Sequence, residues 1–174
     1  LDIPWQPHNR RVSSEKQKED LDLPVLAVLP NGDAPSLWVL GALDTDKDGT
    51  DPLLLNLKKD QFIGDGPHAD GLKNKSWYEL INDIVFKQED APRWVMLLSD
   101  RQLLLIDRFK WLQNRLLRFD WDEILARRDD ATLKATTALL HQQCLVPKQG
   151  NSLLDSLDEN SHKHAFGVSE DLKY

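Results

Sequence analysis

The chain has very little of several residue types, and each shortage excludes a class of protein. Its single cysteine, Cys144, rules out an internal disulfide framework and is typical of a reducing compartment. Apolar runs such as Val95–Leu98 and Leu103–Ile106 are only a few residues long, too short to span a membrane. No secretory signal pattern opens the chain. We therefore expect a cytoplasmic protein without a membrane segment.

Basic residues are also in the minority. The 174 residues include 22 Lys and Arg against 29 Asp and Glu, which gives a formal net charge of −7. This balance is unlike that of a strongly basic nucleic-acid-binding protein. Hydrophobic residues make up 40% of the chain, which is enough for one real core and too much for a disordered protein.

Apolar runs between turn residues indicate where the core begins. Residues 1–22 are polar and mixed in charge, and they predict an extended arm or linker with Trp5 as its one anchor. Buried strands are predicted at Pro24–Leu29 and Leu37–Leu43. Leu53–Leu57 is predicted to be a third strand or a short helix.

A capped helix and a hairpin follow. Ser76 and Glu79 have the spacing of a capping box, and apolar residues at helical spacing predict a helix over 77–87. Arg93–Ser99 and Gln102–Arg108 predict two strands joined by a tight turn, and their consecutive apolar residues predict that both faces of the sheet are covered. Residues 23–119 are therefore expected to form an α/β domain, a small mixed sheet with a packed helix.

From residue 120 onward the apolar period is helical, so 120–174 is expected to be a helical connector. Asp130 and Ser152 are predicted to cap two of its helices, the first running through Cys144. The last residues, Ser169–Tyr174, have the pattern of a helix start. Because one turn of helix is not stable alone, we expect the natural chain to continue into a further region.

An acidic loop has the opening pattern of a calcium site. Asp44, Asp46, Asp48 and Gly49 stand at the first, third, fifth and sixth positions of such a loop. The twelfth position should carry a bidentate Glu, but Leu55 stands there. The sequence therefore favours a solvated acidic turn.

Four residues of the zinc-ligand type occur in the C-terminal part, namely His141, Cys144, His162 and His164. The step from His162 to His164 is tighter than usual zinc spacing, and Cys144 lies on an apolar helix face where a lone cysteine is usually a core residue. The sequence favours the structural role, and we expect no metal site.

Complete catalytic motifs are missing. Restriction-type nucleases need Asp/Glu-x-Lys on a strand to hold magnesium and to stabilise charge at the phosphate, and the one instance is Asp171-Leu172-Lys173 near the end of the chain. Ser-His-Asp patterns, glycine-rich phosphate loops and Cys-x-x-Cys are absent as well. We expect no catalytic residue in this chain.

One segment is basic on an acidic background. Between Arg93 and Arg118 the local charge is +4, which leaves −11 for the remainder, and Phe109 and Trp111 lie among the cations. Such a segment is either an ordinary solvated rim or a contact for a phosphate backbone. If it binds DNA, the residues expected to do so are Arg101, Arg108, Lys110, Arg115 and Arg118.

The hairpin at 92–108 resembles the strand-turn-strand that closes the N-terminal nuclease-like domain of type IIG restriction–modification proteins and related phage-defence methyltransferases. The segments 117–129 and 160–172 are similar to the connector that leads toward the adenine-specific methyltransferase region of that family. The resemblance implies a restriction-nuclease-like fold. Nuclease-active members carry Glu-x-Lys on the second core strand, whereas the counterpart here, Trp38–Leu43, is apolar.

This resemblance implies a non-catalytic N-terminal module of a large DNA methyltransferase that positions double-stranded DNA or defence-system subunits. S-adenosylmethionine would be bound by the rest of that protein, and no cofactor is expected in this chain. Two alternatives stay open. One is a protein–protein scaffold without DNA contact, and the other is a nuclease whose unconventional acidic site uses Asp44, Asp46, Asp48 and Asp51.

Overall fold

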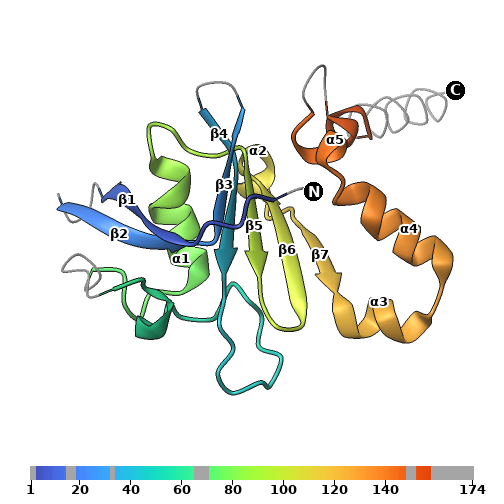
Figure 1. Ribbon diagram of the computed structural model, residues 1–174, viewed down its shortest axis with the longest axis horizontal. Coiled ribbons are helices and arrows are strands. Elements are labelled where there is room, and N and C mark those ends of the chain that lie inside the picture. Colours follow the sequence, from blue (N-terminus) through green and yellow to red (C-terminus); the bar gives the residue numbers. More distant parts are fainter. Residues whose placement is uncertain (1–2, 15–18, 32–33, 65–70, 148–151, 158–174) are drawn as a thin grey trace, which may run out of the picture. The chain divides into compact units, whose positions relative to one another are not determined.

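The computed structural model describes residues 3–14, 19–31, 34–64, 71–147 and 152–157 (Figure 1). Within the chain, residues 3–128 form one compact unit and the residues from Asp129 onward belong to another. No described helix is long and apolar enough to cross a membrane.

The larger unit is a mixed α/β fold built on a five-stranded sheet. The strands lie side by side in the order of the sequence, and each pair is antiparallel except the parallel pair β4–β5. The expected mixed sheet is therefore present, and the expected hairpin is its β5–β6 pair. The strands are β3 (Ala27–Asn31), β4 (Ala34–Gly41), β5 (Trp94–Leu98), β6 (Gln102–Asp107) and β7 (Leu117–Asp120).

The connection between the parallel strands contains η1 (Lys59–Gln61), α1 (Trp77–Asp83) and η3 (Val85–Lys87). The capping box predicted for α1 is confirmed, because the Glu79 amide donates to Ser76 Oγ and the Ser76 amide donates to Glu79 Oε2 at 2.8 Å. Leu53–Leu57 forms turns instead of the expected strand or helix, and Asn56 makes a single bridge to Ser76.

The main core lies on the face of the sheet toward α1. Trp77 and Ile81 of α1 pack in one cluster with Trp38, Val95 and Leu104 of the central strands. The alternate residues of the same strands are buried too, as the consecutive apolar residues of the hairpin predicted. They include Leu37, Val39, Met96, Leu103 and Leu105.

The N-terminal residues contain a hairpin where an extended arm or linker over 1–22 was expected. β1 (His8–Ser14) pairs with β2 (Glu19–Val25) in antiparallel register, and Val12 and Leu21 belong to the core cluster. In β2 the apolar residues Leu21, Leu23 and Val25 alternate with other residues, which is the period of a strand with one buried face.

Two side-chain amides hold this hairpin against the rest of the unit. Gln88 accepts from the Ser13 amide and donates to the Ser13 carbonyl, each at 2.9 Å. Asn9 makes the same pair of hydrogen bonds with the backbone of Ile63, at 2.8 and 3.0 Å. Each side-chain amide thus pairs with one backbone N–H and one backbone C=O group, as a neighbouring strand would.

Two further elements follow β6 where the sequence predicted only a basic segment. α2 (Arg108–Trp111) is a single turn, and β7 comes after it at the sheet edge. α3 (Trp121–Arg127) then begins directly after β7, with Asp120 as its N-cap. The larger unit therefore extends to residue 128, past the expected boundary at 119.

The second unit contains α4 (Asp130–Leu139) and α5 (Gln142–Leu145). Asp129 caps α4, one residue before the expected cap Asp130. The helix predicted to run through Cys144 ends at Leu139, because His141 is extended and caps α5. Residues 153–157 are helical, and Ser152 Oγ accepts from the Asp155 amide as predicted. The expected helix start at Ser169 lies outside the described residues.

Candidate nucleic-acid interface

The five basic residues expected to bind DNA are divided between the two ends of β6. Arg101 precedes this strand and Arg108 follows it, so their backbones are about 20 Å apart. Lys110 lies in α2 beside Arg108, and the Arg115 amide donates to the Lys110 carbonyl at 3.3 Å. Arg118 lies in β7 opposite Leu104. The structure thus brings Arg108, Lys110 and Arg115 together and separates them from Arg101.

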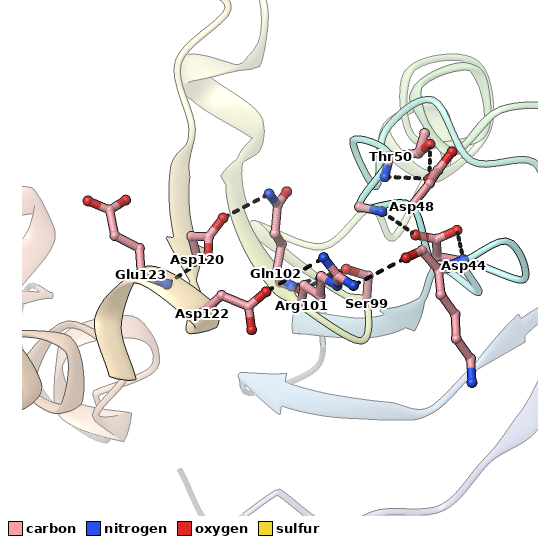
Figure 2. A network of polar contacts seen from close by, with 11 residues as sticks. Asp44, Asp48, Thr50, Ser99, Arg101, Gln102, Asp120, Asp122 and Glu123 are labelled. Atoms are coloured by element: carbon pink, nitrogen blue, oxygen red, sulfur yellow. Dashed lines mark hydrogen bonds and ion pairs between the residues drawn. The ribbon is translucent and has the colours of Figure 1, made fainter. Parts of the chain in front are cut away.

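At the first end, Arg101 and Arg118 are paired with acceptors of the chain itself. The Arg101 guanidinium donates to the Lys47 carbonyl at 3.2 Å and makes an ion pair with Asp122 at 3.8 Å. Figure 2 shows Arg101 and Asp122 side by side. Arg118 makes an ion pair with Asp51 at 2.6 Å. These carboxylates offset the positive charge that a phosphate would need.

The acidic loop beside Arg101 is closed by its own hydrogen bonds. Asp44 is buried and accepts from the amides of Lys47 and Gly49 at 3.1 and 3.0 Å. Asp48 accepts from the hydroxyl of Thr50 at 2.6 Å and from its amide at 2.9 Å, and these bonds lower the pKa of Asp48. Among the described residues, no three His, Cys, Asp or Glu side chains are grouped so that they could hold a metal ion. Asp44 and Asp48 therefore act as turn formers.

Asp120 lies at the corner between β7 and α3. It accepts from the Glu123 amide at 3.1 Å and from the Gln102 side chain at 3.2 Å (Figure 2). The Glu123 bond is the main cause of a lowered pKa for Asp120, and Gln102 and Arg101 add to it. Asp120 thus caps α3 and binds Gln102, and the neighbouring Asp122 pairs with Arg101.

The second end of β6 presents cations together with an exposed ring. α2 begins at Asp107, which accepts from the Phe109 amide at 2.9 Å and makes an ion pair with Arg93 at 3.3 Å. Phe109 is 60% exposed although it lies in a helix. The guanidinium groups of Arg93 and Arg108 each lie 5.3 Å from the Phe109 ring centre. We call Arg93, Arg108, Phe109, Lys110 and Arg115 the α2 corner.

Trp111 fixes the α2 corner to the core. Its ring is buried against Tyr78 and Phe86, with ring centres 5.1 and 6.0 Å away. Its indole nitrogen donates to Asn82 at 3.0 Å. The short helix is thereby held in one place, although a single turn is not stable alone.

The other sequence candidates make local contacts. His141 Nδ1 accepts from the Gln143 amide at 3.3 Å, and the Cys144 thiol donates to the Ala138 carbonyl at 2.7 Å. Burial raises the pKa of Cys144, which disfavours the thiolate that zinc would require. His162 and His164 lie outside the described residues.

Sequence reasoning did not single out Arg93 as a site residue. Arg93 directly precedes the β5 strand, and the register of the hairpin places the neighbouring Trp94 opposite Asp107. The pairing therefore brings Arg93 beside Phe109, although they are far apart in the chain. The signal that could have found it is the alternation of basic and aromatic residues where the first strand of the hairpin begins and where the second strand ends.

No family model, curated protein or solved structure matches the chain. Function is therefore inferred from the α2 corner and its surroundings.

Proposed function

We propose that this chain is a non-catalytic module of a larger DNA-modifying protein, an adenine-specific methyltransferase of a restriction or phage-defence system, and that it positions duplex DNA through the α2 corner. The observation that carries the proposal is an exposed aromatic ring, Phe109, with Arg93 and Arg108 against it and with Lys110 and Arg115 a few residues away in the chain, on an otherwise acidic protein. Clustered cations of this kind contact phosphates and contribute affinity without reading sequence.

The mixed sheet supports a nuclease-like origin for this module. In that fold the second core strand holds the metal-binding carboxylate, and we assign this place to β4. Its residues Trp38 and Leu40 are fully buried in the core, so the strand has no room for a charged group there. In this proposal S-adenosylmethionine belongs to the parent protein, and this module contributes binding alone.

We assign DNA contact to the α2 corner and not to Arg101 and Arg118 near the other end of β6. Measurements of DNA affinity test this assignment. We expect a variant with Arg108→Ala, Lys110→Ala and Arg115→Ala to bind a fluorescent DNA duplex about ten-fold more weakly at low salt, because fewer phosphates are neutralised. The matched control replaces Arg101 and Arg118 with Ala, and it should retain nearly the affinity of the original chain because these residues lie toward the other end of β6, away from the α2 corner. Equal reductions of affinity in both variants would contradict the proposal.

A protein–protein scaffold is the second candidate, and one observation favours it. Leu112 follows α2 and is 89% exposed, and an exposed leucine beside an exposed phenylalanine is typical of a protein contact. Pull-down from an extract treated with nuclease separates the candidates. A partner that is retained after treatment, and released by Leu112→Asp, would favour the scaffold over DNA positioning.

A further inference from the structure

The α2 corner contains a continuous series of stacked rings and guanidinium groups. The Arg93 guanidinium lies 5.0 Å from the ring centre of Trp94 and 5.3 Å from that of Phe109. Arg108 lies 5.3 Å from the Phe109 ring centre. The series therefore runs through Trp94, Arg93, Phe109 and Arg108 in this order, and each step is within the range of a cation–π interaction.

This series leads from the core to the surface. Trp94 is buried, Arg93 and Arg108 are partly exposed, and Phe109 has most of its surface exposed. Because Phe109 is 60% exposed, much of its apolar surface contributes no burial free energy. The exposed end of the series is an aromatic surface with a planar cation beside it.

Hydrogen bonds hold the members of the series in place before any ligand arrives. Asp107 binds the Arg93 side chain and also the Phe109 amide, and the Arg108 guanidinium donates to the Ala91 carbonyl at 3.3 Å. The Arg108 amide donates to the Arg93 carbonyl at 3.0 Å. Binding then costs little conformational entropy, which favours affinity.

We propose that the α2 corner binds an unpaired base of a DNA strand, which stacks on the exposed end formed by Phe109 and Arg108. This inference rests on the proposed function and names the form of DNA that the corner takes. Lys110 lies in α2, and Arg115 follows the helix with its amide bonded to the Lys110 carbonyl. In this proposal their side chains contact the phosphates beside the stacked base.

The exposed ring of Phe109 is the reason that we propose an unpaired base as the ligand. Inside a duplex both faces of each base are covered by neighbouring pairs, so an aromatic side chain finds no free face to contact. An unpaired base offers its face to aromatic rings and to guanidinium planes. Phosphate contacts alone would need no exposed phenylalanine, because lysine and arginine supply them.

The test compares single-stranded and duplex DNA. The probe is a fluorescent single strand of roughly a dozen nucleotides, and the second probe is its duplex with the complementary strand. Phe109→Leu keeps an apolar side chain and removes the aromatic face, and we expect it to weaken binding of the single strand by about five-fold or more. Its binding of the duplex should not change.

Leu112→Ala is the matched control, because Leu112 is the exposed apolar residue nearest to Phe109 along the chain and lies outside the stacked series. It should leave both affinities unchanged. A single strand that contains the fluorescent base aminopurine adds a direct readout, since stacking on Phe109 should quench its emission in the original chain and not in Phe109→Leu. Thermal unfolding should show that all three proteins are folded, with at most a small decrease for Phe109→Leu because it loses two cation–π contacts.

The outcomes separate this inference from the proposed function. If Phe109→Leu binds the single strand as tightly as the original chain does, base stacking is overturned. The proposed function would still stand if the triple basic variant bound the duplex more weakly. If the original chain binds neither form of DNA, the proposed function fails and the inference fails with it.

Discussion

Two glycines adopt backbone angles that other residues rarely take. Gly49 has φ of +79° in the acidic loop, and Gly64 has φ of +78° after η1. A Cβ at Gly49 would lie 3.7 Å from the Arg101 guanidinium, an ordinary contact, and at Gly64 it would meet nothing within 4 Å. The cost of an alanine at either place is therefore conformational, without a clash.

We predict that Gly49→Ala and Gly64→Ala each lower the free energy of unfolding by roughly 1 kcal/mol, because an L-residue is strained at positive φ. Urea denaturation of both variants measures this. A much larger decrease in Gly49→Ala than in Gly64→Ala would show that Arg101 needs the space at Gly49, which the structure does not predict.

The lowered pKa of Asp120 predicts how the stability of the protein depends on pH. Hydrogen bonds from the Glu123 amide and the Gln102 side chain lower the pKa of Asp120 below the ordinary value of 3.8. The stability gained from its charge is therefore complete above that value and disappears as the pH falls through the lowered pKa.

Asp120→Asn keeps a good N-cap residue and removes the charge. We expect this variant to be slightly less stable than the original chain at neutral pH, and its stability to decrease less between about pH 5 and pH 3. Thermal unfolding across this range measures the difference. Parallel pH profiles would show that the charge of Asp120 contributes nothing.

Among the elements, α1 shows how a local signal determines structure. Its capping box joins residues only three apart, so the pattern was visible in the sequence and the helix begins where predicted. We predict that Ser76→Ala lowers the free energy of unfolding by about 1 kcal/mol. Ser76→Thr retains a hydroxyl and should recover most of that decrease. Denaturant titration that finds both variants equal would contradict a capping role.

The β1–β2 hairpin is the element that sequence reasoning missed. Val12 is the one apolar residue of β1, and a single residue gives no periodicity, so the strand is not visible until it pairs with β2. The alternation at Leu21, Leu23 and Val25 was visible, but the charged residues around it favoured an extended arm. α2 and β7 were missed because they are only four residues long.

If the β1–β2 hairpin is part of the domain, the buried residue Val12 of β1 contributes to its stability. Val12 is 1% exposed, and we predict that Val12→Ala lowers the free energy of unfolding by about 2 kcal/mol through reduced burial and a small cavity. Arg11→Ala is the control on the exposed face and should change stability by less than about 0.5 kcal/mol. Equal stability of the two variants would mean that residues 8–14 form an arm after all.

At the scale of the whole molecule, the fold brings together charged residues that are far apart in the sequence. The basic segment was visible in the sequence, but its division was not, because Asp51 is distant from Arg118 along the chain and meets it only in the folded unit. The same holds for Arg93 and Phe109, which the hairpin register brings together. Composition located the segment, and the pairing of strands decided where each of its cations lies.

The salt dependence of DNA affinity tests the central claim most directly, because its slope reflects the number of phosphates that the protein neutralises. We predict that replacing Arg108, Lys110 and Arg115 with alanine reduces this slope by about two to three for duplex DNA, or about one for each cation removed. Replacing Arg101 and Arg118 should leave the slope unchanged. A slope that is the same in all three proteins, or that falls only when Arg101 and Arg118 are replaced, would contradict the assignment of DNA contact to the α2 corner.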